Sequence, residues 1–281
     1  MKLQKEQNLK KLLETVPNGF FVDSKWLTAQ GISRQLVTKY LKSGWLERAG
    51  HGLYRRPTVA VEDSAVELPD WEVLLLSMQH LMGYSLHVGG STALRRRGHG
   101  HYVSIGQNDR VFLYGVSLPG WLKSVQTNAT LELNNLKLFS APDIGLDDGA
   151  KPQDGPHAHP PWRWSLKMSS PERAILEAIK ELPETETFHT IDVMFQGLVN
   201  LRPRRLTELL QACTNIQVKR LFFVFADRHN HAWRKHVDEN DINLGSGDRA
   251  FVMGGKLHPK YRITIPEDLM PQTKGATDET P

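Results

Sequence analysis

The sequence predicts a mixed α/β (α+β) protein with a small N-terminal domain and a larger second domain. With 281 residues, the chain is long enough for two domains. Basic residues are concentrated in residues 1–56, which hold 11 Lys and Arg against 4 Asp and Glu, although the whole chain has a net charge of only +4. Beyond residue 70, apolar residues at helical spacing alternate with short runs typical of strands. These three observations predict a basic module followed by a mixed α/β domain.

Two short helices joined by a glycine turn are predicted in the basic segment. Asp23 or Ser24 can cap the first helix, and Gly31 can adopt the positive φ that ends it. Ser33 can cap the second helix, and Gly44 can end it. Its apolar residues share one face, and these residues lie mostly on the other: Arg34, Gln35, Thr38, Lys39 and Lys42. This pattern is typical of a helix-turn-helix motif.

A basic hairpin follows the second helix. Residues 45–48 and 53–56 are predicted strands, and residues 49–52 form a turn signal between them. A helix-turn-helix followed by such a hairpin is a winged helix, which we assign to residues 1–60. The alternative, a small helical cap with merely solvated charges, is disfavoured because the basic excess is concentrated here. The predicted DNA-binding residues are Ser33, Arg34, Gln35, Thr38, Lys39, Lys42, Arg48, His51 and Arg55.

The remaining boundaries follow from composition. Residues 58–70 carry four acidic residues and no basic one, so residues 61–70 are predicted to be a linker. Residues 71–266 form the predicted second domain. The polar segment 267–281 is predicted to be a disordered tail.

Several local predictions concern the second domain. Ser170 can cap a helix in which Pro171 takes the first position. On that helix, the spacing of Glu177 and Lys180 suggests a surface ion pair. Residues 220–225 fit a buried strand or a continuing helix, because periodicity does not separate the two. Residues 251–253 and 261–266 are predicted to form a hairpin.

No convincing catalytic or metal site is found in the sequence. The three His-x-His pairs lack an accompanying Cys pair, and the Gly-rich segment 245–249 lacks the spacing of a phosphate loop. We therefore expect no enzymatic activity, no cofactor and no metal.

A single cysteine, Cys213, excludes an internal disulfide and favours a reducing cytoplasm. No apolar run is long enough for a membrane span, and no signal peptide is recognised.

Several short sequence blocks are spread over most of the chain. Three of them are Gly44-Trp45-Leu46-Glu47-Arg48, Gly89-Gly90-Ser91-Thr92-Ala93-Leu94 and Ser169-Ser170-Pro171-Glu172-Arg173-Ala174. The others are residues 50–55, 101–102, 200–203, 219–221, 244–249, 254–257 and 260–263. These blocks resemble the AbiEi-type antitoxins, a family in which a lysine commonly stands at the position of Asp248. The order of the blocks along the chain makes the resemblance more specific than any single block.

The resemblance implies an N-terminal winged helix-turn-helix followed by a larger mixed α/β antitoxin domain. It also implies a type IV antitoxin that represses its own operon and counters a co-encoded nucleotidyltransferase toxin, without a need for direct toxin binding. A winged helix contacts a short half-site, so we expect double-stranded operator DNA with inverted repeats as a partner. The alternative is a winged-helix protein whose second domain is a nuclease or a nucleotide-using enzyme.

The basic residues of the second domain are candidates for the surface that counters the toxin. The predicted residues are Lys219, Arg220, Arg249, Lys256 and Lys260. The alternative is that they only form ion pairs with nearby acidic residues.

Overall fold

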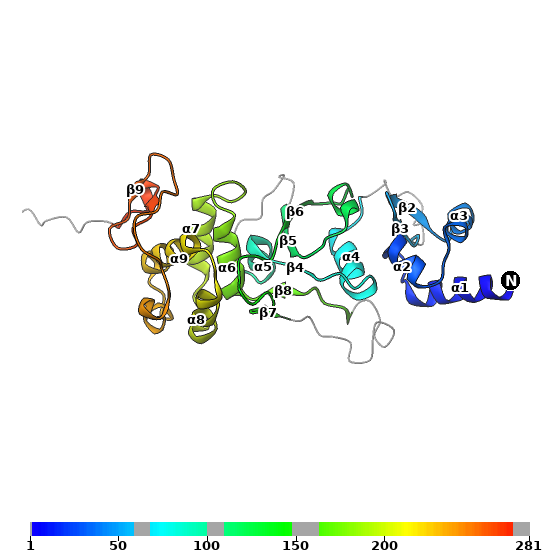
Figure 1. Cartoon of the computed structure of the whole chain (residues 1–281), viewed down its shortest axis with the longest axis horizontal. Coiled ribbons are helices and arrows are strands. Elements are labelled where there is room, and N and C mark those ends of the chain that lie inside the picture. The colour runs from blue at the N-terminus through cyan, green and yellow to red at the C-terminus, as the bar shows by residue number, and fades with distance from the viewer. Residues whose placement is uncertain (1, 59–67, 100–109, 148–162, 272–281) are drawn as a thin grey trace, which may run out of the picture. The chain divides into compact units, whose positions relative to one another are not determined.

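The computed structural model describes residues 2–58, 68–99, 110–147 and 163–271 (Figure 1). Within these ranges the chain is mixed α/β, as the sequence predicts. Its contacts divide it into two compact units, each assembled from three stretches of chain. Unit 1 contains residues 1–88, 103–136 and 146–168, and unit 2 contains residues 89–102, 137–145 and 169–281.

Unit 1 begins with a winged helix-turn-helix, which confirms the fold predicted for the N-terminus. Its elements are α1 (Lys2–Thr15), β1 (Phe21–Asp23), α2 (Ser24–Ala29), α3 (Arg34–Lys42), β2 (Glu47–Gly50) and β3 (Leu53–Arg55). Strand β3 lies between β1 and β2 in an antiparallel sheet, so β1 joins the wing, the β2–β3 hairpin, to the start of α2. Gly31 and Gly44 have φ of 77° and 71°, which confirms them as the residues that end α2 and α3.

The core of the winged helix connects α1 to the helix-turn-helix. Leu12 of α1 and Val16, directly after α1, are buried in one cluster with residues of α2 and α3, among them Leu27, Val37 and Tyr40. Arg56 adds a polar link, because its guanidinium donates to the carbonyl oxygens of Leu13 and Val16, both at 2.6 Å. The amphipathic first helix therefore packs as its apolar spacing predicts.

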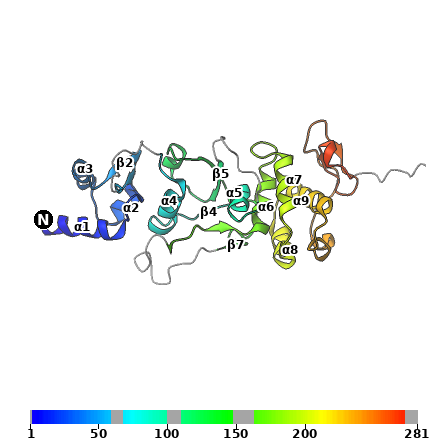
Figure 2. The ribbon, with the colours of Figure 1, turned by 180° about the vertical axis from the view of Figure 1, so that it is seen from behind.

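The rest of unit 1 contains a sheet with helices beside it (Figure 2). Its elements are α4 (Trp71–Leu76), the π-helix η1 (Ser77–Leu81), β4 (Leu86–Val88), β5 (Arg110–Gly115), the 3-10 helix η2 (Gly120–Lys123), β6 (Thr130–Asn134), β7 (Leu146–Asp147) and β8 (Met168–Ser169). Among the described residues the strand order is β6-β5-β4-β8-β7. Strand β4 is antiparallel to β5 and parallel to β8, and β5 is parallel to β6.

The winged helix shares its packing with α4 and η1. Phe21 of β1 and Leu53 of β3 lie in one buried cluster with apolar residues of α4 and η1. The N–H of Phe21 also donates to Ser77 Oγ at 3.0 Å, and the Tyr84 hydroxyl donates to the Asp23 carboxylate at 2.5 Å. The winged helix therefore has a core cluster of its own around Leu27 and Val37, and a second cluster that it shares with α4 and η1.

Ordered structure reaches into the predicted linker and the predicted tail. Asp70 caps α4 by accepting the N–H of Glu72 at 2.9 Å, whereas residues 61–67 lie outside the described residues. The 3-10 helix η6 (Glu267–Leu269) buries Leu269 in the core of unit 2. The predicted disorder is therefore wrong for η6, because an apolar side chain holds it, and residues 272–281 lie outside the described residues.

Unit 2 is built mainly from helices. Its elements are α5 (Gly90–Arg96), α6 (Pro171–Lys180), α7 (Phe188–Gly197), α8 (Pro203–Ala212), α9 (Ile216–His229), the 3-10 helices η4 (Arg234–His236) and η5 (Glu239–Asp241), β9 (Lys256–Leu257), β10 (Thr264–Ile265) and η6. Helix α6 packs against α5, α7, α8 and α9, so it is the centre of this unit (Figure 1). In the part of the chain that the structure describes, no helix has both the length and the apolar character needed to cross a bilayer.

Helix α6 starts as predicted, with Ser170 as its N-cap and Pro171 in its first turn. The prediction for Glu177 is wrong. Its carboxylate is buried and accepts from Arg173 Nε at 2.7 Å, with both side chains 1% exposed. It also accepts the Ser169 hydroxyl at 2.7 Å and the N–H of Gly90 at 3.0 Å. Because helices surround α6 on several sides, Glu177 faces the interior instead of forming a surface pair with Lys180.

Two further predictions are settled by the fold of unit 2. Residues 220–225 belong to α9, so the helical alternative is correct. The predicted hairpin forms in a different register, because β9 pairs with β10 and residues 251–253 are not a strand. The N–H groups of Phe251 and Val252 donate instead to the Thr264 hydroxyl, at 2.7 and 3.0 Å.

Candidate nucleic-acid interface

Helix α3 presents a polar face to solvent. Its buried residues are Leu36, Val37 and Tyr40, and its exposed residues include Arg34, Gln35, Thr38, Lys39 and Lys42. Ser33 caps the helix by accepting the N–H of Leu36 at 3.4 Å. The polar face predicted from helical spacing is therefore exposed. Among the described residues, Arg34, Lys39 and Lys42 have no acidic partner, so their charges are available to a ligand.

The tip of the wing is fixed to the start of α2. Gly52 has φ of 72°, and its carbonyl accepts both the N–H and the hydroxyl of Ser24, at 2.9 and 3.3 Å. The register of the wing also shifts between Arg48 and Gly50. His51 is exposed at this tip, so the fold holds an imidazole beside the cationic face of the winged helix.

The two arginines of the wing differ in their surroundings. Arg48 is exposed, and its guanidinium lies over the Tyr54 ring, 5.9 Å from the centroid. Arg55 forms an ion pair across the hairpin with Glu47 at 3.2 Å. Part of the Arg55 charge is therefore compensated by Glu47, whereas Arg48 has no acidic partner in the described ranges.

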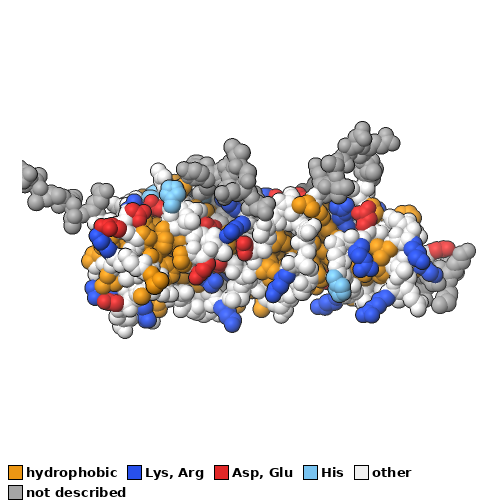
Figure 3. Space-filling view, turned by 90° about the horizontal axis from the view of Figure 1, so that it is seen from above, with side chains coloured by type: hydrophobic (Ala, Val, Ile, Leu, Met, Phe, Trp, Pro, Cys, Tyr) orange, Lys and Arg blue, Asp and Glu red, His pale blue; other side chains and the backbone are white. Residues whose placement is uncertain are grey.

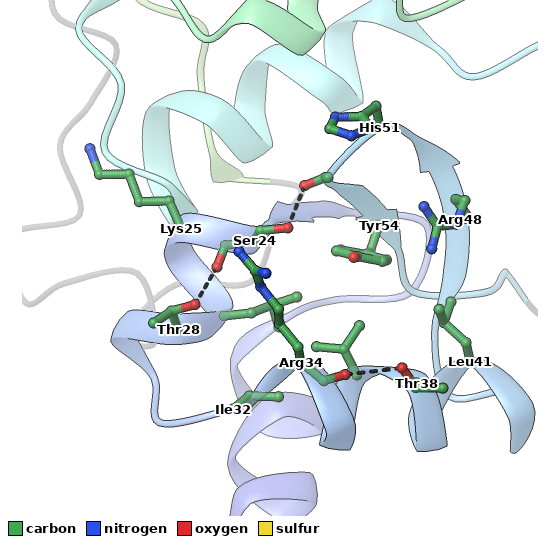
Figure 4. A pocket seen from close by; sticks show the side chains of 13 residues that line it. Ser24, Lys25, Thr28, Ile32, Arg34, Thr38, Leu41, Arg48, His51 and Tyr54 are labelled. Carbon is green, nitrogen blue, oxygen red and sulfur yellow. Dashed lines mark hydrogen bonds between the residues drawn. The ribbon is translucent and has the colours of Figure 1, made fainter.

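A hollow of about 580 Å³ lies between α2, α3 and the wing (Figure 4). Its apolar lining is formed by Leu27, Ile32, Val37, Leu41 and Tyr54. Its rim is formed by the cationic side chains of Lys25, Arg34 and Arg48 and by the imidazole of His51, all of them exposed. In Figure 4, Arg34 extends from α3 toward Ser24, and Arg48 extends from β2 toward Tyr54. The hollow therefore combines an apolar floor with a cationic rim.

Lys25 belongs to this site, although the sequence analysis did not select it. It lies in the first turn of α2, and its ammonium group is 6.0 Å from the centroid of the Tyr84 ring. The signal in the sequence was the position of Lys25, directly after Asp23 and Ser24, the predicted capping residues of α2. Only the fold shows that this turn borders the same hollow as the wing.

Basic side chains gather over the winged helix on the face seen in Figure 3, at the right of the view, with few acidic side chains among them. This agrees with the concentration of positive charge in residues 1–56. A surface of this kind attracts polyanions such as the phosphate backbone of DNA.

Two residues of the predicted toxin-countering surface are not on a surface at all. Lys219 and Arg220 are 4% and 3% exposed, because α9 turns both of them toward the interior. Lys219 Nζ donates to the carbonyl of Asn243 at 3.1 Å. Arg220 donates at 2.7 to 2.8 Å to the carbonyl oxygens of Leu244, Gly247 and Arg262. Both side chains hold the loop after η5, so their assignment to the surface is wrong.

The other three predicted residues are exposed but differ in their partners. Lys256 pairs with Glu267, and Lys260 pairs with Glu239 and, at 3.2 Å, with Asp227. Within the described ranges, Arg249 alone of the five is exposed without an acidic partner. The alternative of local ion pairing therefore holds for Lys256 and Lys260.

Asp227 lies at the centre of a charged network in unit 2. Arg234 Nε contacts its carboxylate at 2.7 Å, and the Tyr261 hydroxyl donates to it. Burial alone would raise the pKa of Asp227, but the Tyr261 hydrogen bond and the charges of Arg234 and Lys260 hold it below its usual range. A carboxylate held ionised in this way is a poor general base, so the network favours a structural role.

The histidine pairs do not assemble a metal site in the described part of the chain. His229 Nε2 lies 2.8 Å from the Asp192 carboxylate, and His231 Nε2 lies 2.7 Å from the Phe195 carbonyl. The other two pairs include residues outside the described ranges, namely His101, His157 and His159. Within those ranges no group of three or more His, Cys, Asp or Glu residues is placed to hold a metal ion.

These features define a winged-helix protein with an uncompensated cationic helix, a class that includes transcriptional regulators. Two family models match the chain. One, described as the N-terminal domain of the AbiEi antitoxin transcriptional regulator, matches residues 5–105. The other, described as a transcriptional regulator, AbiEi antitoxin, type IV TA system, matches residues 108–266. The protein therefore belongs to the AbiEi antitoxin family of transcriptional regulators, which confirms the resemblance found in the sequence.

The fold is also found in a solved structure. The crystal structure of the RV2827C protein from Mycobacterium tuberculosis is similar with a TM-score of 0.53 and 13% sequence identity. The similarity covers 91% of this chain and 88% of that chain. At this level of identity it shows a shared fold alone. A comparison with curated protein sequences gave no match.

Proposed function

We propose that this protein binds operator DNA through α3 and the wing and thereby represses its own operon. The observation that carries the proposal is the exposed face of α3, where Arg34, Lys39 and Lys42 have no acidic partner among the described residues. Such charges gain most from a polyanionic ligand, since no internal contact is lost on binding. Membership of a family of transcriptional regulators supports the same function.

The geometry suggests different roles for the two elements. Arg34, Gln35, Thr38 and Lys39 lie on the exposed face of α3, where a recognition helix contacts base edges in the major groove. Ser33 and Lys42 lie at its two ends, next to the expected path of the phosphates. On the wing, Arg48, His51 and Arg55 are suited to the backbone or the minor groove. Base contacts set specificity, whereas phosphate contacts mainly set the salt dependence.

Titration of the region upstream of the gene in a gel-shift assay tests this interface. Arg34→Ala and Lys39→Ala should each weaken binding by about 1–3 kcal/mol, the usual contribution of a base contact. Lys123→Ala is a matched control, because Lys123 is exposed in the same unit but lies on η2, outside the winged helix. Wild-type affinity in both α3 variants would show that the face does not bind DNA.

The operator should contain two inverted half-sites. A single α3 contacts only a short sequence, so tight repression needs two copies of the winged helix on neighbouring half-sites. DNase footprinting of the upstream region should therefore show two protected half-sites related by inverted symmetry. Protection of one isolated half-site would contradict this part of the proposal.

We also propose that the antitoxin counters a co-encoded nucleotidyltransferase toxin through unit 2, without a requirement for direct toxin binding. The family model described as the antitoxin covers residues 108–266 and therefore most of the described part of unit 2. Arg249, Lys256 and Lys260 remain exposed candidates in that unit, and the unpaired Arg249 is the strongest of them.

Rescue and repression should respond to different substitutions. Arg34→Ala should lose repression of a promoter reporter and still rescue cells from the cognate toxin. Arg249→Ala should have the opposite effect. If Arg34→Ala abolished rescue at an unchanged protein level, neutralisation would depend on DNA binding, and the proposed division between the units would be wrong.

A further inference from the structure

The hollow between α2, α3 and the wing has a chemistry that DNA phosphates alone do not require. A phosphate backbone needs cations, and the rim of the hollow provides them. It has no use for the apolar floor, which consists of the partly exposed Leu41 and the core residues Leu27, Ile32, Val37 and Tyr54. The volume of about 580 Å³ also lies within the range of roughly 300–1,000 Å³ that is typical of small-molecule sites. The combination fits a ligand with both an anionic group and an apolar ring.

The serine and threonine hydroxyl groups of the hollow already donate their protons to backbone carbonyl oxygens. Ser24 Oγ donates to the Gly52 carbonyl at 3.3 Å, Thr28 Oγ1 donates to the Ser24 carbonyl at 2.8 Å, and Thr38 Oγ1 donates to the Arg34 carbonyl at 3.1 Å (Figure 4). A hydroxyl has a single proton, so these three groups meet a ligand as acceptors. Their free lone pairs suit the N–H and O–H groups of a sugar or a base.

The rim of the hollow provides further donors on basic side chains. Among the described residues none of them has an acidic partner: Lys25, Arg34, Arg48 and His51. Arg34 and Arg48 present planar guanidinium groups, which bind a phosphate with two parallel hydrogen bonds and also stack on flat rings. They come from α3 and from β2, so a ligand between them would touch both elements of the proposed DNA surface.

We propose that the hollow binds a free nucleotide, with its phosphate at Arg34 and Arg48 and its base against the apolar floor. The bound nucleotide then competes with operator DNA, because both ligands require the same two guanidinium groups. The competition, but not the binding, rests on the proposed DNA-binding function. The site thereby makes repression responsive to the concentration of a small anionic metabolite.

Isothermal titration of the full chain tests the binding directly. Adenosine monophosphate is the probe. Adenosine and inorganic phosphate, which each correspond to one part of this nucleotide, are titrated separately as controls. The monophosphate should bind at least about tenfold more tightly than either half, because only the complete nucleotide meets both the rim and the floor. Equal affinity for inorganic phosphate, or no saturable binding of the monophosphate up to the millimolar range, would overturn the proposal.

Variants locate the site. Arg34→Ala and Arg48→Ala should each weaken binding of the monophosphate by about tenfold or more, the usual loss for a charge-assisted hydrogen bond. Arg48→Lys keeps the charge but loses the planar fork, so its affinity should be intermediate. Lys123→Ala should bind as the wild type does. Unchanged affinity in both Arg34→Ala and Arg48→Ala would show that the nucleotide binds elsewhere and overturn the assignment.

A gel-shift titration with saturating adenosine monophosphate then tests the competition. The affinity for operator DNA should fall with nucleotide in the wild type and should not respond to it in Arg48→Ala. If DNA binding is absent altogether, the proposed function fails, while the calorimetric result still stands. If Arg48→Ala loses DNA affinity but the monophosphate does not bind, the hollow holds only the DNA backbone, and the nucleotide proposal is wrong.

Discussion

The basic residues of the winged helix and those of unit 2 have opposite surroundings. On α3, Arg34, Lys39 and Lys42 are exposed and lack acidic partners among the described residues. In unit 2, Arg220 is buried against three carbonyl oxygens, and Lys260 is held by two carboxylates. The charges of the first group are available to a ligand. Those of the second group already interact with carbonyl and carboxylate oxygens of the protein itself.

The difference shows that pairing and burial, and not the number of basic residues, decide whether a positive charge can bind a ligand. Removal of a buried, fully bonded cation leaves acceptors unsatisfied and destabilises the fold. Removal of an exposed cation without a partner changes stability little, so its effect should appear in binding.

The largest effect is expected for the buried arginine of α9. Arg220→Met should lower the free energy of unfolding by about 3–5 kcal/mol, because three carbonyl oxygens lose a charged donor that is itself buried. Arg249→Met is the control, since Arg249 is exposed in the same unit and has no acidic partner in the described part of the chain. Urea unfolding followed by circular dichroism measures both. If the free energy of unfolding fell by a similar small amount in both variants, the contrast between buried and exposed cations would be wrong.

Acid should weaken unit 2 through the pair of Glu172 and Arg202, whose side chains meet at 3.0 Å. Burial alone would raise the pKa of Glu172, but the hydrogen bonds and the charge of Arg202 lower it to about 2. A carboxylate whose pKa is lower in the folded state stabilises the fold above its unfolded pKa, so this contribution should be lost as the pH falls from about 4.5 to about 2. The loss should amount to at most about 3 kcal/mol.

Unfolding titrations between pH 5 and pH 2.5 on the wild type and on Glu172→Gln measure this contribution. The variant should be less stable at pH 5, and its stability should depend less on pH. Glu208→Gln is the control, because Glu208 forms an exposed pair with Arg204 on α8. A pH dependence as steep in Glu172→Gln as in the wild type would contradict the role of this pair.

The smallest effect is expected for the difference in salt dependence of DNA binding between variants of Arg48 and Arg55, the two arginines of the wing. Arg48→Ala should reduce the salt dependence of DNA binding by about one unit of slope, as expected for the loss of one phosphate contact. Arg55→Ala should reduce it less, because Glu47 already compensates part of the Arg55 charge at 3.2 Å. Affinities at several salt concentrations measure the two slopes. A larger change in Arg55→Ala would show that the pair opens when DNA binds.

The sequence by itself determined the local elements at the N-terminus and the start of α6. Gly31 and Gly44 end their helices, and Ser170 with Pro171 starts α6, because caps and positive φ depend on a few neighbouring residues. It also determined the exposed face of α3, since helical spacing separates Val37 and Tyr40 from the polar residues. The family was evident from the order of its sequence blocks.

Only the tertiary structure decided which charges are available. Helical spacing put Glu177 next to Lys180, but packing around α6 buried it with Arg173. The same spacing did not show that Lys219 and Arg220 face the interior, because that depends on the loop after η5 packing against α9. The hollow beside Lys25 and the core shared by Phe21 and the α4–η1 segment also join residues far apart in sequence. Burial, pairing and concave shape arise from such distant contacts, which neither local propensity nor periodicity encodes.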